Sequence, residues 1–160
     1  DGFFRTGDAG YINPDGDIVL TERIKDLFKT SNGKYIAPQA IESRLGEDKY
    51  IEQVAVIGDN RKFVTAIIVP ALEAIKEYAR RKQIQYRSLE ELVKNAQVRE
   101  LISRRIEALQ DGLASFEKIK KFTLLPKEFT MEAGELTNTL KIRRPVINRH
   151  YASEIEAMYA

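Results

Sequence analysis

Cysteine is absent from this sequence of 160 residues, and histidine occurs once, as His150. Without cysteine the chain has no disulfide bond, no thiolate nucleophile and no cysteine ligand for a metal, which agrees with a reducing compartment. A single histidine also excludes a metal site built from several histidines. We therefore expect no metal centre on ligands of these two kinds.

Long apolar segments and a strong charge of one sign are missing as well. No run of about 18 apolar residues occurs, and no signal-peptide pattern, so we expect no membrane-spanning segment. Lysine and arginine total 26 against 24 aspartates and glutamates, and the formal net charge is +2. Such a balance does not indicate nucleic-acid binding on charge alone.

What the chain does contain is the composition of a globular domain. Apolar residues make up 43% and charged residues 31% of the sequence. At this length, one domain of ordinary size can bury a core. The chain opens with DGFFRTGD rather than with an initiator methionine. We interpret it as a piece of a larger protein, which could carry only part of an active site.

Two turn signals lie near the start of the chain. Residues 9–21 hold Pro14-Asp15-Gly16 between two apolar runs, and this pattern predicts a hairpin because proline presets the turn and glycine supplies a positive φ. A second hairpin or loop is expected where two short stretches flank Thr30-Ser31-Asn32-Gly33. The charged residues 22–26 lie between these two hairpins and are the candidate linker.

The remainder of the chain alternates strands and helices. Ser88 and Glu91 have the spacing of a capping box at a helix start. The pattern predicts an α+β fold, in which an N-terminal β-hairpin and a linker precede a small mixed sheet covered by helices. The expected elements are a helix from Pro38 to Gly46, antiparallel strands at 51–58 and 63–70, helices between 71 and 115, a strand at 122–125 and short helices at 144–150 and 152–159.

Four stretches could carry chemistry, and each also has an ordinary interpretation. FRTGD, at residues 4–8, places Asp8 in a turn, where its two oxygens could accept the two hydroxyls of a ribose. ERIKD, at residues 22–26, could be a solvated charge run. The glycine hairpin around Asn32 and Gly33 could be only a turn. In GELTNTLKIRR, Lys141 follows a threonine-rich loop that is either solvated surface or a segment that delivers a cation to a phosphate or carboxylate.

Taken together, FRTGD, ERIKDLFKTSNGKYIAPQAIE and GELTNTLKIRR resemble the C-terminal part of the adenylate-forming, AMP-binding acyl-CoA synthetases. The resemblance is closest to the long-chain fatty acid–CoA ligase branch, and it covers nearly the whole chain in the expected order. Two departures occur. The sequence has Glu22-Arg23 where the family mostly has Gly-Arg, and Asn138 where many relatives have proline; neither displaces the arginine or the lysine.

The resemblance implies a division of the chain and a role for each motif. Residues 1–22 would be the tail end of a large N-terminal adenylation domain, 23–26 the hinge, and 27–160 the mobile C-terminal lid domain. Such enzymes join a fatty acid to ATP, giving an acyl-adenylate and pyrophosphate, and then pass the acyl group to coenzyme A. Mg2+ and ATP would be bound mainly through the N-terminal domain, so the isolated fragment is expected to be inactive.

By the same resemblance, Lys141 matches the catalytic lysine of the first step. Asp8 would bind the ribose of ATP and AMP, and Arg23 the same ribose or the phosphate. Lys25 matches the hinge residue about which the small domain rotates. The hairpin that enters the site for the second step and lines the pantetheine channel would contribute Ser31, Asn32, Gly33 and Tyr35.

Other interpretations stay open. The enzyme could activate a shorter acyl, an aryl or an amino-acid substrate, because the acyl pocket would lie outside this chain. A non-catalytic module could instead bind a nucleic acid or an anionic membrane, although interleaved acidic residues argue against it. We expect no nucleic-acid partner and a cytoplasmic location, with peripheral membrane association of the whole enzyme left open. The basic residues that such a module would use are Arg104, Arg105, Lys118, Lys120 and Lys121.

Overall fold

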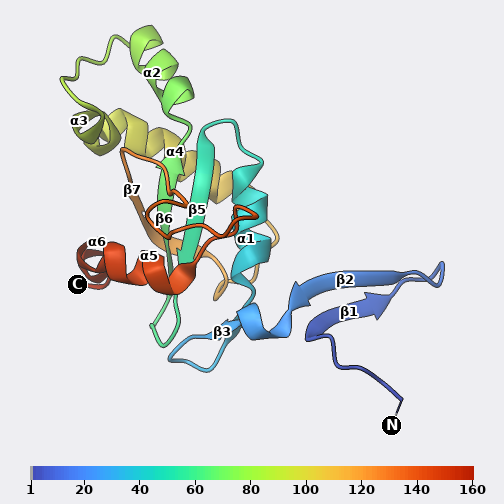
Figure 1. Cartoon of the computed structure of the whole chain (residues 1–160). Helices are drawn as coiled ribbons and strands as arrows, with labels where there is room; N and C mark the ends of the chain where they lie inside the picture. Colours follow the sequence, from blue (N-terminus) through green and yellow to red (C-terminus); the bar gives the residue numbers. More distant parts are fainter. Residues whose placement is uncertain (1) are drawn as a thin grey trace.

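Two antiparallel strands at the start of the chain form a hairpin that projects away from the remaining elements (Figure 1). The computed structural model describes residues 2–160, without the side chains of Thr21, Glu22 and Lys25. Strand β1 spans Asp8–Ile12 and β2 spans Ile18–Arg23. The turn between them contains Gly16 at φ 89°, a conformation that glycine adopts at little cost. The predicted first hairpin is thus confirmed.

The hairpin leaves its apolar side chains uncovered. Between 57% and 75% of the surface of each of four large side chains is exposed, although β-branched and aromatic residues normally pack against a second layer. Large apolar side chains that stay exposed in this way are typical of a surface that takes part in an interaction. These four side chains are Tyr11, Ile12, Ile18 and Leu20.

A short 3-10 helix and a second hairpin follow. The 3-10 helix η1 spans Ile24–Asp26, and the strands β3, Phe28–Lys29, and β4, Tyr35–Ile36, pair in antiparallel fashion. Gly33 has φ 81° at the turn, so the predicted glycine hairpin is confirmed. The charged run at 22–26 is divided, since its first two residues end β2 and the others form η1. Lys25 lies in η1, and its side chain falls outside the described part of the chain.

The central sheet has the strand order β5-β6-β7. Helix α1, Pro38–Gly46, precedes β5, Ile51–Ile57, which pairs antiparallel with β6, Val64–Pro70. Proline at the first helical position is already set for the helix, and the helix ends at Gly46 as expected. All seven residues of β6 are buried, because this middle strand is covered on both faces of the sheet.

The predicted helical region consists of three helices and ends earlier than expected. They are α2, Leu72–Arg81, α3, Leu89–Lys94, and α4, Ala96–Leu109. Only half of the predicted capping box forms. The Ser88 hydroxyl accepts from the Glu91 N–H at 3.2 Å, but the Glu91 carboxylate accepts from the N–H of Arg87.

Strand β7, Ile119–Leu124, begins three residues before the predicted strand at 122–125 and pairs parallel to β6. A parallel pair requires a long crossover, and α2 to α4 supply it. The sheet is therefore mixed, as expected. Helices α5, Arg144–His150, and α6, Ala152–Tyr159, close the fold.

Two buried clusters lie on the two faces of this sheet, because successive strand residues point to opposite sides. Val54 and Val56 face the cluster covered by α1 and α4, whereas Ala55 and Ile57 face the cluster covered by α5 and α6 (Figure 1). The α+β prediction of a small mixed sheet covered by helices is confirmed. Within residues 2–160, no helix has both the length and the apolar character needed to cross a bilayer.

Candidate functional site

Asp8 and Arg23 lie opposite each other at the open end of the first hairpin. They are register partners, and Arg23 Nε is 3.3 Å from Asp8 Oδ1. The Asp8 side chain is 23% exposed and that of Arg23 is 52% exposed. An exposed ion pair of this kind contributes little stability, so both groups can be rearranged by a ligand at low cost. The structure thus brings two of the predicted site residues together.

The second hairpin is held by main-chain bonds within its own turn. The N–H of Thr30 donates to the Lys34 carbonyl at 2.9 Å, and the N–H of Gly33 donates to the Thr30 carbonyl at 2.9 Å. Tyr35 is 64% exposed, and the Lys29 ammonium lies 5.5 Å from the centre of its ring. The turn therefore presents an aromatic face and a cation to its surroundings.

The turn between β5 and β6 forms hydrogen bonds with this hairpin. The N–H of Ser31 donates to the Arg61 carbonyl at 2.9 Å, and the Asn32 side-chain amide donates to the Lys62 carbonyl at 3.2 Å. A third bond runs from the N–H of Asn60 to the carbonyl of Lys29 at 2.9 Å. Sequence reasoning missed this support, because the partners lie about thirty positions apart.

Arg61 connects that turn to the last helix. Its guanidinium pairs with Glu156 and lies 4.8 Å from the centre of the Tyr159 ring. The hydrogen bond to Glu156 raises the pKa of Arg61, and the same bond lowers the pKa of the Glu156 carboxyl. The glycine hairpin is thereby linked, through Arg61, to α6.

Lys141 lies in a tightly closed loop, defined here as the lysine loop, residues 136–142. Leu136 and Ile142 form an antiparallel bridge at its base. Within it, the N–H of Thr137 donates to the Lys141 carbonyl at 2.8 Å, and the Thr137 hydroxyl accepts from the Lys141 N–H at 3.1 Å. Leu140 takes φ 61°, which lets the chain reverse direction over so few residues.

The side chain of Lys141 is exposed. Among the ion pairs of the described residues, none involves this lysine. A lysine ammonium is a compact charge on a flexible stem, so it can reach an anion beyond the domain surface. The backbone that carries it is fixed by two hydrogen bonds to Thr137.

Glu135 precedes the lysine loop and is almost fully buried. Its carboxylate accepts from the Tyr151 hydroxyl at 2.9 Å, from His150 Nδ1 at 3.0 Å and from the Thr130 N–H at 3.1 Å. Burial opposes ionisation of Glu135, but these three bonds outweigh it and lower the pKa. Burial raises the pKa of Tyr151. An acidic residue just before the lysine loop was the only sign of this network in the sequence.

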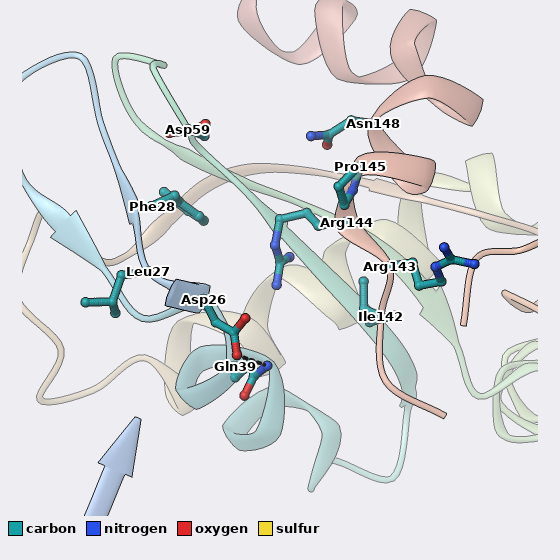
Figure 2. Close-up of a pocket in the computed structure, with 10 residues that line it drawn as sticks. All are labelled: Asp26, Leu27, Phe28, Gln39, Asp59, Ile142, Arg143, Arg144, Pro145 and Asn148. Carbon is teal, nitrogen blue, oxygen red and sulfur yellow. Dashed lines mark hydrogen bonds between the residues drawn. The ribbon is translucent and has the colours of Figure 1, made fainter. Parts of the chain in front are cut away.

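A cavity of about 450 Å³ lies between the segment after η1 and the start of α5. In Figure 2, the Arg144 side chain extends into this region, whereas Arg143 turns away from it. Arg144 Nη1 donates to Glu42 at 2.5 Å and to the Val56 carbonyl at 2.7 Å. The lining residues are Asp26, Leu27, Phe28, Gln39, Asp59, Ile142, Arg143, Arg144, Pro145 and Asn148.

The predicted site residues form separate groups. In Figure 1 the first hairpin projects to one side, the β3–β4 turn lies at the lower edge, and the segment leading to α5 runs across the sheet. Asp8 and Arg23 therefore share one group, the glycine hairpin forms a second, and Lys141 a third. Among residues 2–160, no three acidic or histidine side chains are grouped as a metal site built from the protein alone would require.

The family of AMP-binding enzyme C-terminal domains matches residues 25–160. The chain belongs to this family.

Its curated relatives include long-chain-fatty-acid–CoA ligase FadD15 of Mycobacterium tuberculosis, which is 34% identical over 160 residues, 99% of this chain and 27% of the relative. Long-chain-fatty-acid–CoA ligase 1 of Homo sapiens is 35% identical over 163 residues, 100% of this chain and 23% of the relative. The chain thus spans about a quarter of the length of these relatives. The resemblance noted from the sequence motifs is confirmed.

Solved structures show the same fold. The A domain of a carboxylic acid reductase from Segniliparus rugosus, in complex with AMP, matches 96% of this chain and 23% of its own, with a TM-score of 0.76 and 26% identity. A Mycobacterium tuberculosis fatty acyl CoA synthetase matches 96% of this chain and 25% of its own, with a TM-score of 0.55. At 22% identity, this second likeness concerns the fold alone.

Proposed function

We propose that this chain is the C-terminal lid of an ATP-dependent long-chain fatty acyl-CoA synthetase. The observation that carries the proposal is the exposed Lys141 on a fixed loop, within a domain whose family and relatives are AMP-binding enzymes and long-chain-fatty-acid–CoA ligases. The enzyme would join a fatty acid to ATP and transfer the acyl group to coenzyme A.

In the first half-reaction, a carboxylate oxygen bonds to the α-phosphorus of ATP while the bond to pyrophosphate breaks. Both partners are anionic, and further negative charge develops on the transferring oxygens. The Lys141 ammonium would lie between them, screen their repulsion and stabilise the in-line transition state. Loss of such a contact costs a few kcal/mol, equivalent to a rate decrease on the order of 10² to 10³.

Asp8 and Arg23 would hold the nucleotide during this step. The carboxylate of Asp8 can accept both hydroxyls of a ribose, and Arg23 can contact the same ribose or the phosphate. The ion pair between them is exposed, so exchanging it for ligand contacts costs little.

In the second half-reaction, the thiol sulfur of coenzyme A attacks the acyl carbonyl, the thiol proton is lost and AMP leaves. The glycine hairpin, with Ser31, Asn32, Gly33 and Tyr35, would line the path of the pantetheine arm. Lys141 would have to withdraw to admit the thiol. Rotation of residues 27–160 about the 23–26 hinge, at Lys25, would move Lys141 out of the site and bring the glycine hairpin into it.

The rest of the enzyme would be a large N-terminal domain against which residues 1–22 pack. The exposed apolar side chains of the first hairpin support this docking. The adenine pocket, the acyl pocket and the Mg2+ site would lie mainly in that domain, so the isolated chain would be inactive. We place the enzyme in the cytoplasm or at a membrane surface.

A second candidate is an adenylate-forming enzyme with a different acyl or thiol substrate. The A domain of a carboxylic acid reductase matches this chain with the higher of the two TM-scores quoted above, 0.76, which favours keeping this alternative. Both candidates share the first half-reaction and differ in the acid activated and in the acceptor of the acyl group.

The deciding experiment is an assay of the intact protein with ATP, coenzyme A and saturated acids from acetate to long-chain fatty acids. The proposal predicts acyl-CoA, AMP and pyrophosphate, with the highest kcat/KM for the long chains. Adenylate formation without thioester would favour the second candidate, and the absence of any AMP would contradict both.

A further inference from the structure

Glu135 holds both ends of the lysine loop. Its backbone carbonyl accepts from the N–H of Arg143 at 2.8 Å, just beyond the end of the loop. Its side chain, 4% exposed, is bound by Thr130, His150 and Tyr151, as described above. One residue thus joins the loop to the junction of α5 and α6.

Among the described residues, the three donors to this carboxylate are a main-chain N–H, a phenol and an imidazole, and none is an arginine or a lysine. Burying a carboxylate without a permanent cation is costly, and an apolar side chain could fill the same space without that cost. What the carboxylate adds is direction, since its donors approach from two separate segments, Thr130 and the α5–α6 junction with His150 and Tyr151. Its orientation is therefore fixed more strictly than packing alone would fix it.

The connection to the reactive group is short. The hydrogen bonds to its carboxylate hold Glu135 in place, and Leu136 follows it directly in the chain. The bridge between Leu136 and Ile142 closes the loop. Thr137 then binds both the N–H and the carbonyl of Lys141. Each link is a hydrogen bond or a bridge, so a shift of Glu135 would be transmitted to Lys141.

We infer that Glu135 is a positioning residue for Lys141, and that its carboxylate sets where the lysine loop leaves the domain. This inference rests on the proposed function, because it assigns Glu135 to the adenylation step. The hairpin of the thioester step is bonded to the β5–β6 turn, and that turn reaches α6 near its C-terminal end, at Glu156 and Tyr159, rather than at the α5–α6 junction. We therefore expect Glu135 to act on the first half-reaction and not on the second.

The test uses the intact enzyme with Glu135→Gln, which keeps the size of the side chain but not its three-fold acceptor pattern. Pyrophosphate release measures adenylation, and conversion of supplied acyl-adenylate to acyl-CoA measures the second step. A misplaced catalytic group lowers kcat by up to about 10², so we expect a ten- to hundredfold loss of adenylation kcat. The KM for ATP and the rate of the second step should stay unchanged.

Asp48→Asn is the matched control for loss of a buried carboxylate. The Asp48 side chain is 1% exposed and binds Arg105 at 2.6 Å and the N–H of Tyr50 at 2.9 Å, on the other face of the sheet from the Glu135 network. This variant should lose stability but keep the ratio of the two half-reaction rates. An equal loss of adenylation in Asp48→Asn and Glu135→Gln would overturn the inference.

Lys141→Ala separates this inference from the proposed function. If Lys141→Ala loses adenylation while Glu135→Gln keeps it, the inference fails and the proposed function stands. If Lys141→Ala itself keeps adenylation, both fail. Should Glu135→Gln not fold, Tyr151→Phe removes one donor with little change in packing, and a selective decrease in adenylation would support the inference, whereas unchanged adenylation would refute it.

Discussion

The carbonyl of Arg61 accepts a hydrogen bond from the N–H of Ser31 at 2.9 Å, and this bond joins the glycine hairpin to the central sheet. The guanidinium of the same arginine pairs with Glu156 and lies over Tyr159. The hairpin proposed for the thioester step is therefore placed by α6 as well as by its own turn.

Arg61→Ala tests this placement. The main-chain bond to Ser31 can persist, but the turn loses its attachment to α6, so we expect a severalfold slower conversion of supplied acyl-adenylate to acyl-CoA. Adenylation should not change. Arg104→Ala is the matched control, because Arg104 forms an ordinary exposed pair with Glu100 on α4 at 3.2 Å. Equal effects on both half-reactions would argue against a specific role of Arg61.

Lys25→Pro tests the hinge. Proline fixes φ and removes the backbone N–H, so it should oppose rotation at the position within η1 where the lid is proposed to turn. We expect near-normal adenylation and a blocked second step in pre-steady-state measurements. Lys25→Ala removes the side chain but keeps backbone freedom, and it should behave like the wild type. An unchanged second step in Lys25→Pro would place the rotation elsewhere.

Isothermal titration tests where the nucleotide binds. Asp8 and Arg23 offer contacts for a ribose, but the described residues present no group assigned to the adenine ring. The isolated chain should therefore show no micromolar binding of ATP, whereas the intact enzyme should bind it. Micromolar affinity in the isolated chain would contradict the division of the site between two domains.

Acid should remove the stabilisation that Glu135 provides. Its pKa in the folded chain lies below the ordinary value of 4.5, so its contribution to the free energy of unfolding is present above that pH and is lost as the pH falls through the folded pKa. In urea unfolding of the isolated chain, the stability difference between wild type and Glu135→Gln should shrink from pH 6 to pH 3. A difference that stays constant would mean that the ionised carboxylate is not the stabilising form.

Local sequence signals predicted the elements whose ends are set by turn residues. Gly16 and Gly33 marked both hairpins, and Pro38 marked the start of α1. The β5–β6 pair followed from two β-branched runs with a short connection, as a hairpin requires. Composition and these signals together were enough to give the α+β class.

Contacts between distant segments were beyond such signals. The parallel pairing of β6 and β7 depends on a crossover of three helices, and nothing local to either strand encodes its partner. The hydrogen bonds from the Ser31 N–H to the Arg61 carbonyl and from the Tyr151 hydroxyl to the Glu135 carboxylate likewise join distant segments. The candidate site residues came from motif resemblance, whereas the residues that hold them in place appeared only in three dimensions.

The role of Lys141 is tested most directly by the rates of the two half-reactions in Lys141→Ala of the intact enzyme. The control is Lys120→Ala, which removes an exposed lysine of β7 far from the lysine loop in sequence. We predict that Lys141→Ala loses adenylation by a factor on the order of 10² to 10³ and still converts supplied acyl-adenylate to acyl-CoA at the wild-type rate. Lys120→Ala should keep both activities. An equal decrease of both half-reactions in Lys141→Ala, or no decrease in adenylation, would contradict the role of this lysine.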